Sequence, residues 1–276
     1  MAQLIEFPIK AATRAGNALV QPLRSAWPVH SVDDYGRDPH LISALAPLAK
    51  LRWDVTVGGE QHLPVRTGAL LVCNTRRFSL STVYAALALS EATGRPVRFV
   101  GRPDIAPVGP FMRRIGGMPA NQANLKRLLE SDEQVMVFPE GAKGFGKPYS
   151  ERYQLQRFGR GGFVEVALET GTPIVPVAVV GSEEIYPKLG QSDAAAKLLG
   201  APYVPITPTF PLLGPLGLLP LPSRWRIEFL EPVDLSEYGP GASEDRSLVL
   251  DISEQVRGSI QEALYDGLLK RGPAFL

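Results

Sequence analysis

Short runs of apolar, often β-branched residues alternate with segments of helical periodicity along most of the chain, and this alternation limits the folds it can adopt. The runs predict strands near 52–57, 69–73, 97–101, 134–138, 174–180 and 225–230. The segments between them predict helices near 81–92, 121–130, 160–170 and 246–270. Such alternation indicates a single α/β domain with a largely parallel sheet flanked by helices.

The length of the chain, 276 residues, is enough for one large domain with a substantial core. We expect an N-terminal helical segment over 1–50, which could face a membrane, and an α/β domain over 51–235. Residues 236–276 should form a C-terminal helix packed on that domain, because apolar side chains recur at helical spacing from Val249 to Leu268.

The composition argues against several classes of protein. A formal net charge of +1 argues against general nucleic-acid binding, which needs a clustered basic excess. The single cysteine, Cys73, cannot form an internal disulfide and fits a reducing compartment such as the cytoplasm. The three histidines, His30, His40 and His62, do not stand at metal-ligand spacing. We therefore expect no nucleic-acid partner, no metal site and no cofactor.

Two segments bear on membrane contact. Charged residues interrupt the first 24 residues, so they lack the apolar core of a secretory signal and instead predict a basic amphipathic helix. That helix could pack on the domain or lie on a membrane surface. Residues 198–223 contain no charged residue, but their seven prolines forbid a continuous membrane-spanning helix.

The second segment is either an extended loop buried against the domain or an apolar rim resting in the membrane interface. Because stable attachment usually needs two signals, the two segments together predict peripheral association with the inner face of the membrane.

The residues that could carry chemistry concentrate after the expected strand at 134–138. Glu140 and Gly141 follow it, and ligands of open α/β sheets bind just beyond the carboxyl ends of the strands. Several cations follow Glu140 in the sequence: Lys143, Lys147, Arg152, Arg157 and Arg160. They could bind a phosphate or another anionic group, or they could form an ion-pair network that braces a long loop.

The same region resembles a known family. The sequence F-P-E-G-A-K at 138–143 resembles the third motif of the phospholipid/glycerol acyltransferase family (1-acylglycerol-3-phosphate acyltransferase-like), usually F-P-E-G-T-R-S. I-V-P-V-A at 174–178 is similar to the fourth motif, and the runs at 151–163 and 181–187 are similar to a bacterial subgroup, whose proline-rich segment resembles 205–211. The resemblance covers roughly residues 50–235. It implies an α/β fold that transfers a fatty acyl group from coenzyme A or acyl carrier protein to a glycerolipid hydroxyl at a membrane.

The first motif of this family is degenerate. The resemblance implies Asn-His at a strand end, followed by an Asp that orients the His, which takes the proton from the acceptor hydroxyl. Asn74 matches the Asn, but Thr75 stands at the His position. The Asp position falls on Leu80, or on Thr82 if the turn is longer. The base and its orienting acid are therefore both replaced.

The neighbouring residues do not restore a base. Near neutral pH a threonine stays neutral and an arginine stays charged, so neither Thr75 nor Arg76 and Arg77 can take a proton. Cys73 belongs to an apolar run and is expected to be a packed core residue. Arg76 and Arg77 could hold an anionic head group, or they could be solvated at the rim of a relic site.

The second motif, at 109–122, is also altered. It keeps Gly116, but the Arg that binds the acceptor's phosphate in the family aligns with Gln122. The residues that we predict to bind substrate are Asn74, Arg76, Arg77, Gln122, Glu140, Gly141 and Lys143. We expect the residues of the first and third motifs to gather at one cleft.

Two hypotheses follow. In the first, the chain binds an acyl thioester or a glycerolipid without efficient catalysis and could serve an active enzyme as a partner. In the second, it is a working acyltransferase whose base is His30, His40 or His62, folded over the site from elsewhere.

Overall fold

The computed structural model describes residues 32–51, 53–64, 66–74, 80–102, 108–141, 147–192, 194, 204–214, 217 and 219–275. The predicted N-terminal helix therefore lies outside the described residues. So do the predicted site residues Thr75, Arg76, Arg77 and Lys143.

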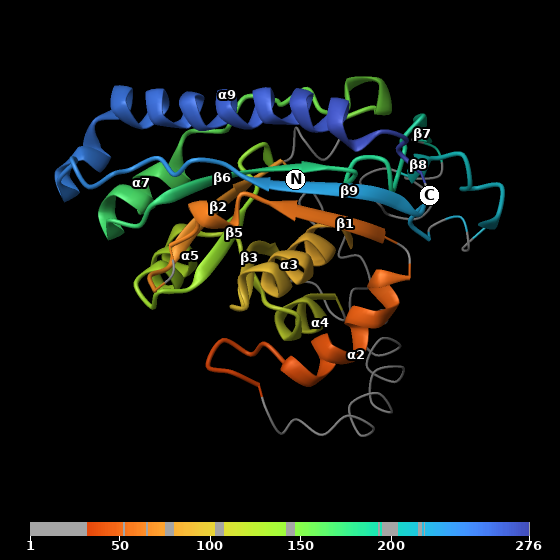
Figure 1. Cartoon of the computed structure of the whole chain (residues 1–276), viewed down its shortest axis with the longest axis horizontal. Helices are drawn as coiled ribbons and strands as arrows, with labels where there is room; N and C mark the ends of the chain where they lie inside the picture. Colours follow the sequence, from red (N-terminus) through yellow and green to blue (C-terminus); the bar gives the residue numbers. More distant parts are fainter. Residues whose placement is uncertain are drawn as a thin grey trace, which may run out of the picture.

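The centre of the described fold is a seven-stranded sheet (Figure 1). Its strands, in spatial order, are β1 (Trp53–Gly58), β9 (Ser223–Phe229), β6 (Ile174–Val180), β2 (Ala69–Cys73), β5 (Gln134–Val137), β3 (Val97–Arg102) and β4 (Gly117–Pro119). The five strands from β6 to β4 run parallel to one another. β9 pairs antiparallel with β6, and β1 pairs parallel with β9. The sheet is therefore largely parallel, as predicted.

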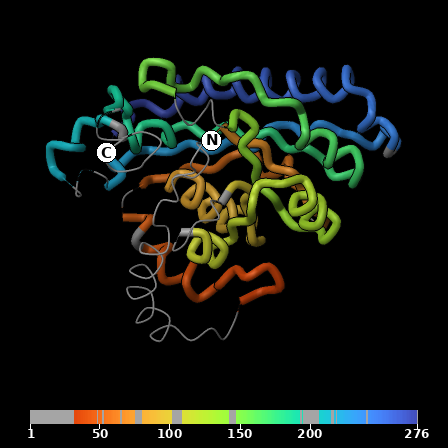
Figure 2. The backbone as a smooth tube through the Cα atoms, turned by 180° about the vertical axis from the view of Figure 1, so that it is seen from behind, coloured from red at the N-terminus to blue at the C-terminus, as the bar shows by residue number. Residues whose placement is uncertain are grey.

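Helices cover both faces of this sheet. α5 (Gln122–Leu129), α7 (Gly162–Thr170) and α9 (Arg246–Arg271) pack on one face. α2 (Pro39–Lys50), α3 (Leu80–Thr93) and α4 (Val108–Arg114) pack on the other. The two opposite views show the long α9 on one side of the sheet and α2 on the other (Figure 1, Figure 2). Short 3-10 helices occur at Glu60–His62, Tyr149–Glu151 and Pro240–Glu244.

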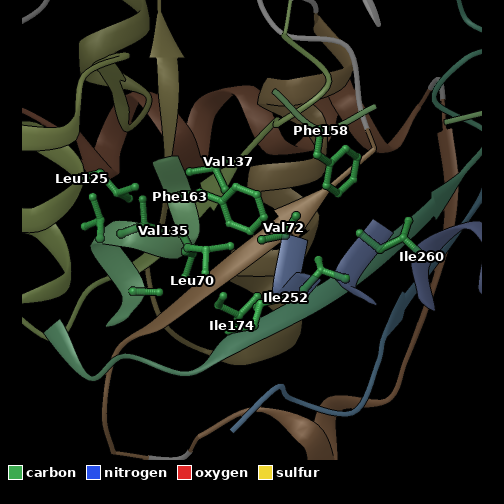
Figure 3. Packing of buried hydrophobic residues seen from close by; sticks show 14 of the residues in the cluster. Leu70, Val72, Leu125, Val135, Val137, Phe158, Phe163, Ile174, Ile252 and Ile260 are labelled. Atoms are coloured by element: carbon green, nitrogen blue, oxygen red, sulfur yellow. The ribbon is translucent and has the colours of Figure 1, made fainter. Parts of the chain in front are cut away.

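The alternation of side chains along the strands explains the two faces. In β2, Leu70 and Val72 point to the α5–α7–α9 side, whereas Leu71 and Cys73 point to the α2–α3–α4 side. Every residue of β2 and β6 is buried, which explains why their sequences read as continuous apolar runs. Figure 3 shows the buried core on the α5–α7–α9 side of the sheet, where Phe163 of α7 and Ile252 of α9 approach Val72 and Ile174.

The six predicted strands and the four predicted helices are all present, with ends shifted by a few residues. The N-cap predicted for α5 is also confirmed, because the Asn121 side chain accepts a hydrogen bond from the Asn124 N–H at 2.7 Å. α2 was expected only as part of a helical segment, and α4 and β4 were not predicted. β4 has three residues and α4 seven, which is too short for a recognisable period.

Between β6 and β9 the chain leaves the sheet. It forms the small antiparallel pair β7 (Gly190–Ser192) and β8 (Val204–Ile206), followed by irregular turns. Leu212, Leu213 and Leu219 in these turns are exposed, with Leu212 83% exposed. The described part of residues 198–223 is therefore not a loop wholly buried against the domain, and its contact with a membrane stays a prediction. None of the helices in the described part of the chain is long and apolar enough to cross a membrane.

Candidate functional site

The carboxyl ends of β2, β5 and β6 meet at one edge of the sheet, which we call the carboxyl edge. β2 pairs with β5 through Val72 and Val137, so the residues that follow, Asn74 and Pro139, lie roughly one strand spacing, about 5 Å, apart. Glu140 and Gly141 come next in the chain. The described residues of the first and third motifs therefore lie at the same edge.

Asn74 continues the pairing of β2 with β6 beyond the last backbone ladder position. Its Nδ2 donates to the Val179 carbonyl at 3.0 Å, and the Val179 N–H donates to Oδ1 at 2.7 Å. The side chain is buried at 2% exposure. Asn74 thus holds the carboxyl end of β2 against β6. Its direct contact with substrate stays a prediction.

The two candidates for the acid position differ in environment. Leu80 is the first residue of α3 and is 43% exposed, whereas Thr82 is buried at 2% exposure. Neither carries a carboxylate, and a carboxylate placed at Thr82 would be buried.

Glu140 is a buried carboxylate beside a lysine. Its Oε2 accepts a hydrogen bond from the Gln156 N–H at 2.9 Å and lies 3.7 Å from the Lys147 ammonium. Burial raises the pKa of Glu140 above its ordinary value, although Lys147 and the Gln156 N–H act in the opposite direction. Gly141 adopts a φ of +58°, which favours glycine at the turn after Glu140.

Lys147 joins Glu140 to the loop that follows β6. Its ammonium lies 3.2 Å from Glu183 Oε1 and donates to the Gln154 carbonyl at 3.1 Å. The same Glu183 oxygen accepts a hydrogen bond from the Tyr153 N–H at 3.2 Å. The loop after Gly141 is therefore tied to the carboxyl end of β6 by a buried ion pair.

Tyr153 extends this network to α9. Its hydroxyl donates to a carboxylate oxygen of Glu184 and accepts from the Gly181 N–H at 2.7 Å. The other Glu184 oxygen lies 2.9 Å from Arg271 at the end of α9. Burial raises the pKa of the Tyr153 hydroxyl well above its ordinary value, so this hydroxyl stays protonated and keeps donating.

This network corresponds to the bracing alternative considered from the sequence, with Lys147 as its cation. The arginines that the sequence grouped with Glu140, namely Arg152, Arg157 and Arg160, are exposed. Arg152 lies over the Tyr149 ring at 4.4 Å. Tyr153, Glu183 and Glu184 belong to the runs that resemble the bacterial subgroup, but no role was predicted for them. Two consecutive glutamates shortly after a fully apolar strand are the signal that could have identified this role.

Gln122 occupies the position of the family's phosphate-binding arginine. Its Nε2 donates to Glu165 Oε2 at 2.8 Å, and the other Glu165 oxygen lies 2.8 Å from Arg246. Gln122 also lines a cavity of about 340 Å³ between the ends of β3 and β5 and the first turns of α5 and α7. Gln122 itself carries no charge, the Glu165 carboxylate is paired with Arg246, and Arg160 lines the same cavity.

Neither described histidine lies near Asn74. His62 Nδ1 lies 2.9 Å from the Phe229 carbonyl, and β9 is two strand spacings from β2, roughly 10 Å. His40 is in the first turn of α2, next to Asp38, whose N–H donates to the Arg114 carbonyl just before β4 begins. That position is near the amino end of β4, which is three strands from β2 in the sheet. His30 lies outside the described residues.

The α/β sandwich and the F-P-E-G and V-P-V motifs around the carboxyl edge together define a protein of the acyl-transfer class. The family model described as Acyltransferase matches residues 54–180. The chain belongs to the acyltransferase family.

Similar proteins come from bacteria and plants. Uncharacterised proteins of Mycobacterium bovis and Mycobacterium tuberculosis are each 42% identical over 257 residues, which cover 89% of this chain and 72% of each relative. Phytyl ester synthase 2 of the Arabidopsis thaliana chloroplast is 35% identical over 71 residues, or 26% of this chain and 10% of that protein.

A solved structure supports the fold. The 1-acyl-sn-glycerophosphate (LPA) acyltransferase PlsC from Thermotoga maritima matches with a TM-score of 0.55 and 17% identity, over 85% of this chain and 82% of that chain. At this identity the likeness shows a shared architecture.

Proposed function

We propose that this acyltransferase-family chain binds an acyl thioester, a glycerolipid or both, and that its transfer activity is impaired or lost. The acyl thioester would be one of coenzyme A or acyl carrier protein. The proposal rests on one observation: the family's fold and its Asn74 are retained, whereas the positions of the catalytic base and acid are occupied by other residues. Asn74 still bonds to Val179, while Thr75 replaces the base and Leu80 or Thr82 replaces its acid.

The chemistry explains the expected loss. Acyl transfer needs a base to take the proton of the acceptor hydroxyl as its oxygen attacks the thioester carbonyl and the thiolate leaves. Without general-base help the rate typically falls by roughly 10² to 10⁴. The placement of His40 and His62 away from Asn74 supports the absence of a substitute base.

We further propose that the protein is cytoplasmic and attaches peripherally to the inner face of the membrane, where an active enzyme could be its partner. The basic N-terminal segment and the apolar rim of 198–223 support this location. Flotation of liposomes with the full chain and with a chain lacking residues 1–26 measures the share of binding due to the first segment.

A second candidate function is an active acyltransferase that takes an acyl group from acyl-CoA or acyl carrier protein. The similarity to phytyl ester synthase, named for an ester-forming activity, favours it. The uncharged Gln122, in place of the family's phosphate-binding Arg, is compatible with an acceptor alcohol that has no phosphate group. The acceptor would then be the hydroxyl of a long-chain alcohol, of a lysophospholipid or of another glycerolipid.

The two candidates differ in turnover. Calorimetric titration with acyl-CoA measures binding, and a thiol-release assay measures transfer to a panel of lysophospholipids and long-chain alcohols. The first candidate predicts binding without release above the uncatalysed rate. Absence of binding to every acyl thioester and lysolipid tested would contradict it, and release that depends on an acceptor would establish the second.

A further inference from the structure

We propose that the excursion between β6 and β9 docks on a lipid bilayer through a set of exposed apolar side chains. We call the described part of residues 189–222 the apolar projection. Its large exposed apolar residues are Leu189, Ile206, Leu212, Leu213 and Leu219. The inference deepens the proposed function and rests on it in one respect, because a lipid ligand is the reason for the site to face a bilayer.

The projection exposes apolar area without charge. Leu212 and Leu213 lie together in the turns after β8, at 83% and 56% exposure. No charged residue occurs from 198 to 223. Exposed apolar patches of this kind mark protein or membrane contact sites.

The backbone of the projection is hydrogen-bonded within itself. The N–H groups of Leu213 and Gly214 donate to the carbonyls of Thr209 and Pro211, both at 2.8 Å. The Thr209 hydroxyl donates to the Gly217 carbonyl at 2.9 Å. The segment's seven prolines carry no N–H group that would need a partner. Internally paired backbone is what an apolar medium requires, since lipid offers no hydrogen bonds.

The composition favours a bilayer over a protein partner. Contacts that hold proteins together are enriched in tryptophan, tyrosine and arginine at their centres and have a polar rim. The exposed large apolar side chains of the projection are leucine and isoleucine, and no arginine occurs between 198 and 223. Leucine side chains insert well into the acyl boundary of a membrane.

The projection is attached to the carboxyl edge. The Leu221 N–H donates to the Ile185 carbonyl at 2.9 Å, and the Ser223 hydroxyl donates to the Gly181 carbonyl at 3.3 Å. The same 181–185 loop carries Glu183 and Glu184 of the buried network. Figure 1 shows β7 and β8 at the end of the sheet where β9 begins. Docking through the projection therefore turns the edge that holds Asn74 and Glu140 toward the bilayer.

A flotation experiment tests the surface. The full chain is mixed with phosphatidylcholine vesicles in 0.5 M NaCl, where attraction of basic segments to the lipid is screened. We expect the wild type to float and Leu212→Ser/Leu213→Ser to bind at least about tenfold more weakly, because two inserted leucines are lost. The matched control is Phe111→Ser/Tyr238→Ser, at positions 42% and 40% exposed on α4 and on the chain that follows β9, which should float like the wild type.

A fluorescent probe reports insertion directly. The single native cysteine, Cys73, is buried, so a polarity-sensitive dye attached to Leu212→Cys or to Tyr238→Cys labels one position. With vesicles, the dye at 212 should shift to the blue and be quenched by lipid-borne quenchers, whereas the dye at 238, beyond the other end of β9, should not. Thermal unfolding of each variant checks that it folds.

The outcomes separate this proposal from the proposed function. A dye at 212 that stays water-like while the protein floats would overturn it, as would a wild type that does not float. Sedimentation showing a dimer that Leu212→Ser/Leu213→Ser dissociates, without lipid binding, would show that a second copy covers the projection instead. Binding of short-chain acyl-CoA in vesicle-free solution tests the proposed function independently.

Discussion

The Asn74 amide exchanges two hydrogen bonds with the Val179 backbone in a buried position, so it acts as one more rung between β2 and β6. A residue that the family resemblance linked to the active site therefore has a structural reason to be asparagine that does not depend on catalysis. Such a residue can persist after the base beside it is replaced.

The first prediction is that Asn74→Ala lowers the free energy of unfolding by about 2–4 kcal/mol, because it leaves the Val179 N–H and carbonyl without partners. Urea unfolding followed by circular dichroism measures the loss. Asn121→Ala, which removes an exposed helix cap, is the control and should cost about 1 kcal/mol. Equal losses in the two variants would contradict the positioning role of Asn74.

The second prediction concerns Glu140 and pH. Its pKa is raised in the folded protein, mainly by burial, so the folded state holds this proton more tightly than the unfolded state. The stabilisation from the protonated Glu140 carboxyl group is therefore fully present below the ordinary pKa of 4.5. It declines as the pH rises through the raised pKa. The stability of the wild type relative to Glu140→Gln should fall from pH 4.5 upward.

The measurement is the unfolding free energy of both proteins from about pH 4 to pH 8, by urea at fixed salt. The difference between them cancels the titration of the groups they share. An advantage of the wild type that grows with pH would show that the Lys147 attraction outweighs burial.

At the scale of elements, the 147–156 loop is held between the end of β6 and α9. Tyr153 contributes at both ends, since its hydroxyl contacts Gly181 and Glu184, and Gln261 of α9 donates to its carbonyl at 2.8 Å. Tyr153 also has a φ of +62°, which a non-glycine residue adopts only when its surroundings hold it. The network therefore orders the loop that follows the F-P-E-G turn.

The third prediction is that Tyr153→Phe costs about 1–3 kcal/mol of stability, because the buried Gly181 N–H loses its acceptor and Glu184 loses a donor. Hydrogen exchange should show faster opening of the 147–156 and 181–185 loops than of β2. Tyr265→Phe, on the exposed side of α9, should leave both stability and exchange unchanged.

The elements themselves could be predicted from the sequence because their patterns are local. β2 and β6 are apolar throughout, and α9 repeats apolar residues every three or four positions. Lys147 was one of several cations that the sequence placed near Glu140, but its second partner, Glu183, could not be predicted, because the two meet only after strands distant in sequence pair. The burial of Thr82 and the exposure of Leu80 likewise depend on how α3 packs.

For the whole molecule, the central claim is that the acyltransferase fold is retained while the site lacks the His base and the Asp that orients it. The family's acid position falls on Leu80 or Thr82, and we test Leu80 first, because it begins α3, where the helix dipole favours a carboxylate.

The measurement that tests this claim most directly is thiol release from an acyl-CoA in the presence of lysophospholipid. It compares the wild type with Thr75→His, Leu80→Asp and the double variant. Wild type should match the uncatalysed rate, and each single variant should gain little, because an imidazole without an orienting acid spends its time in wrong tautomers. The double variant should exceed the product of the single effects, since base and acid work as a unit. Clear turnover by the wild type, abolished by changing His30, His40 or His62 to Ala, would contradict the account.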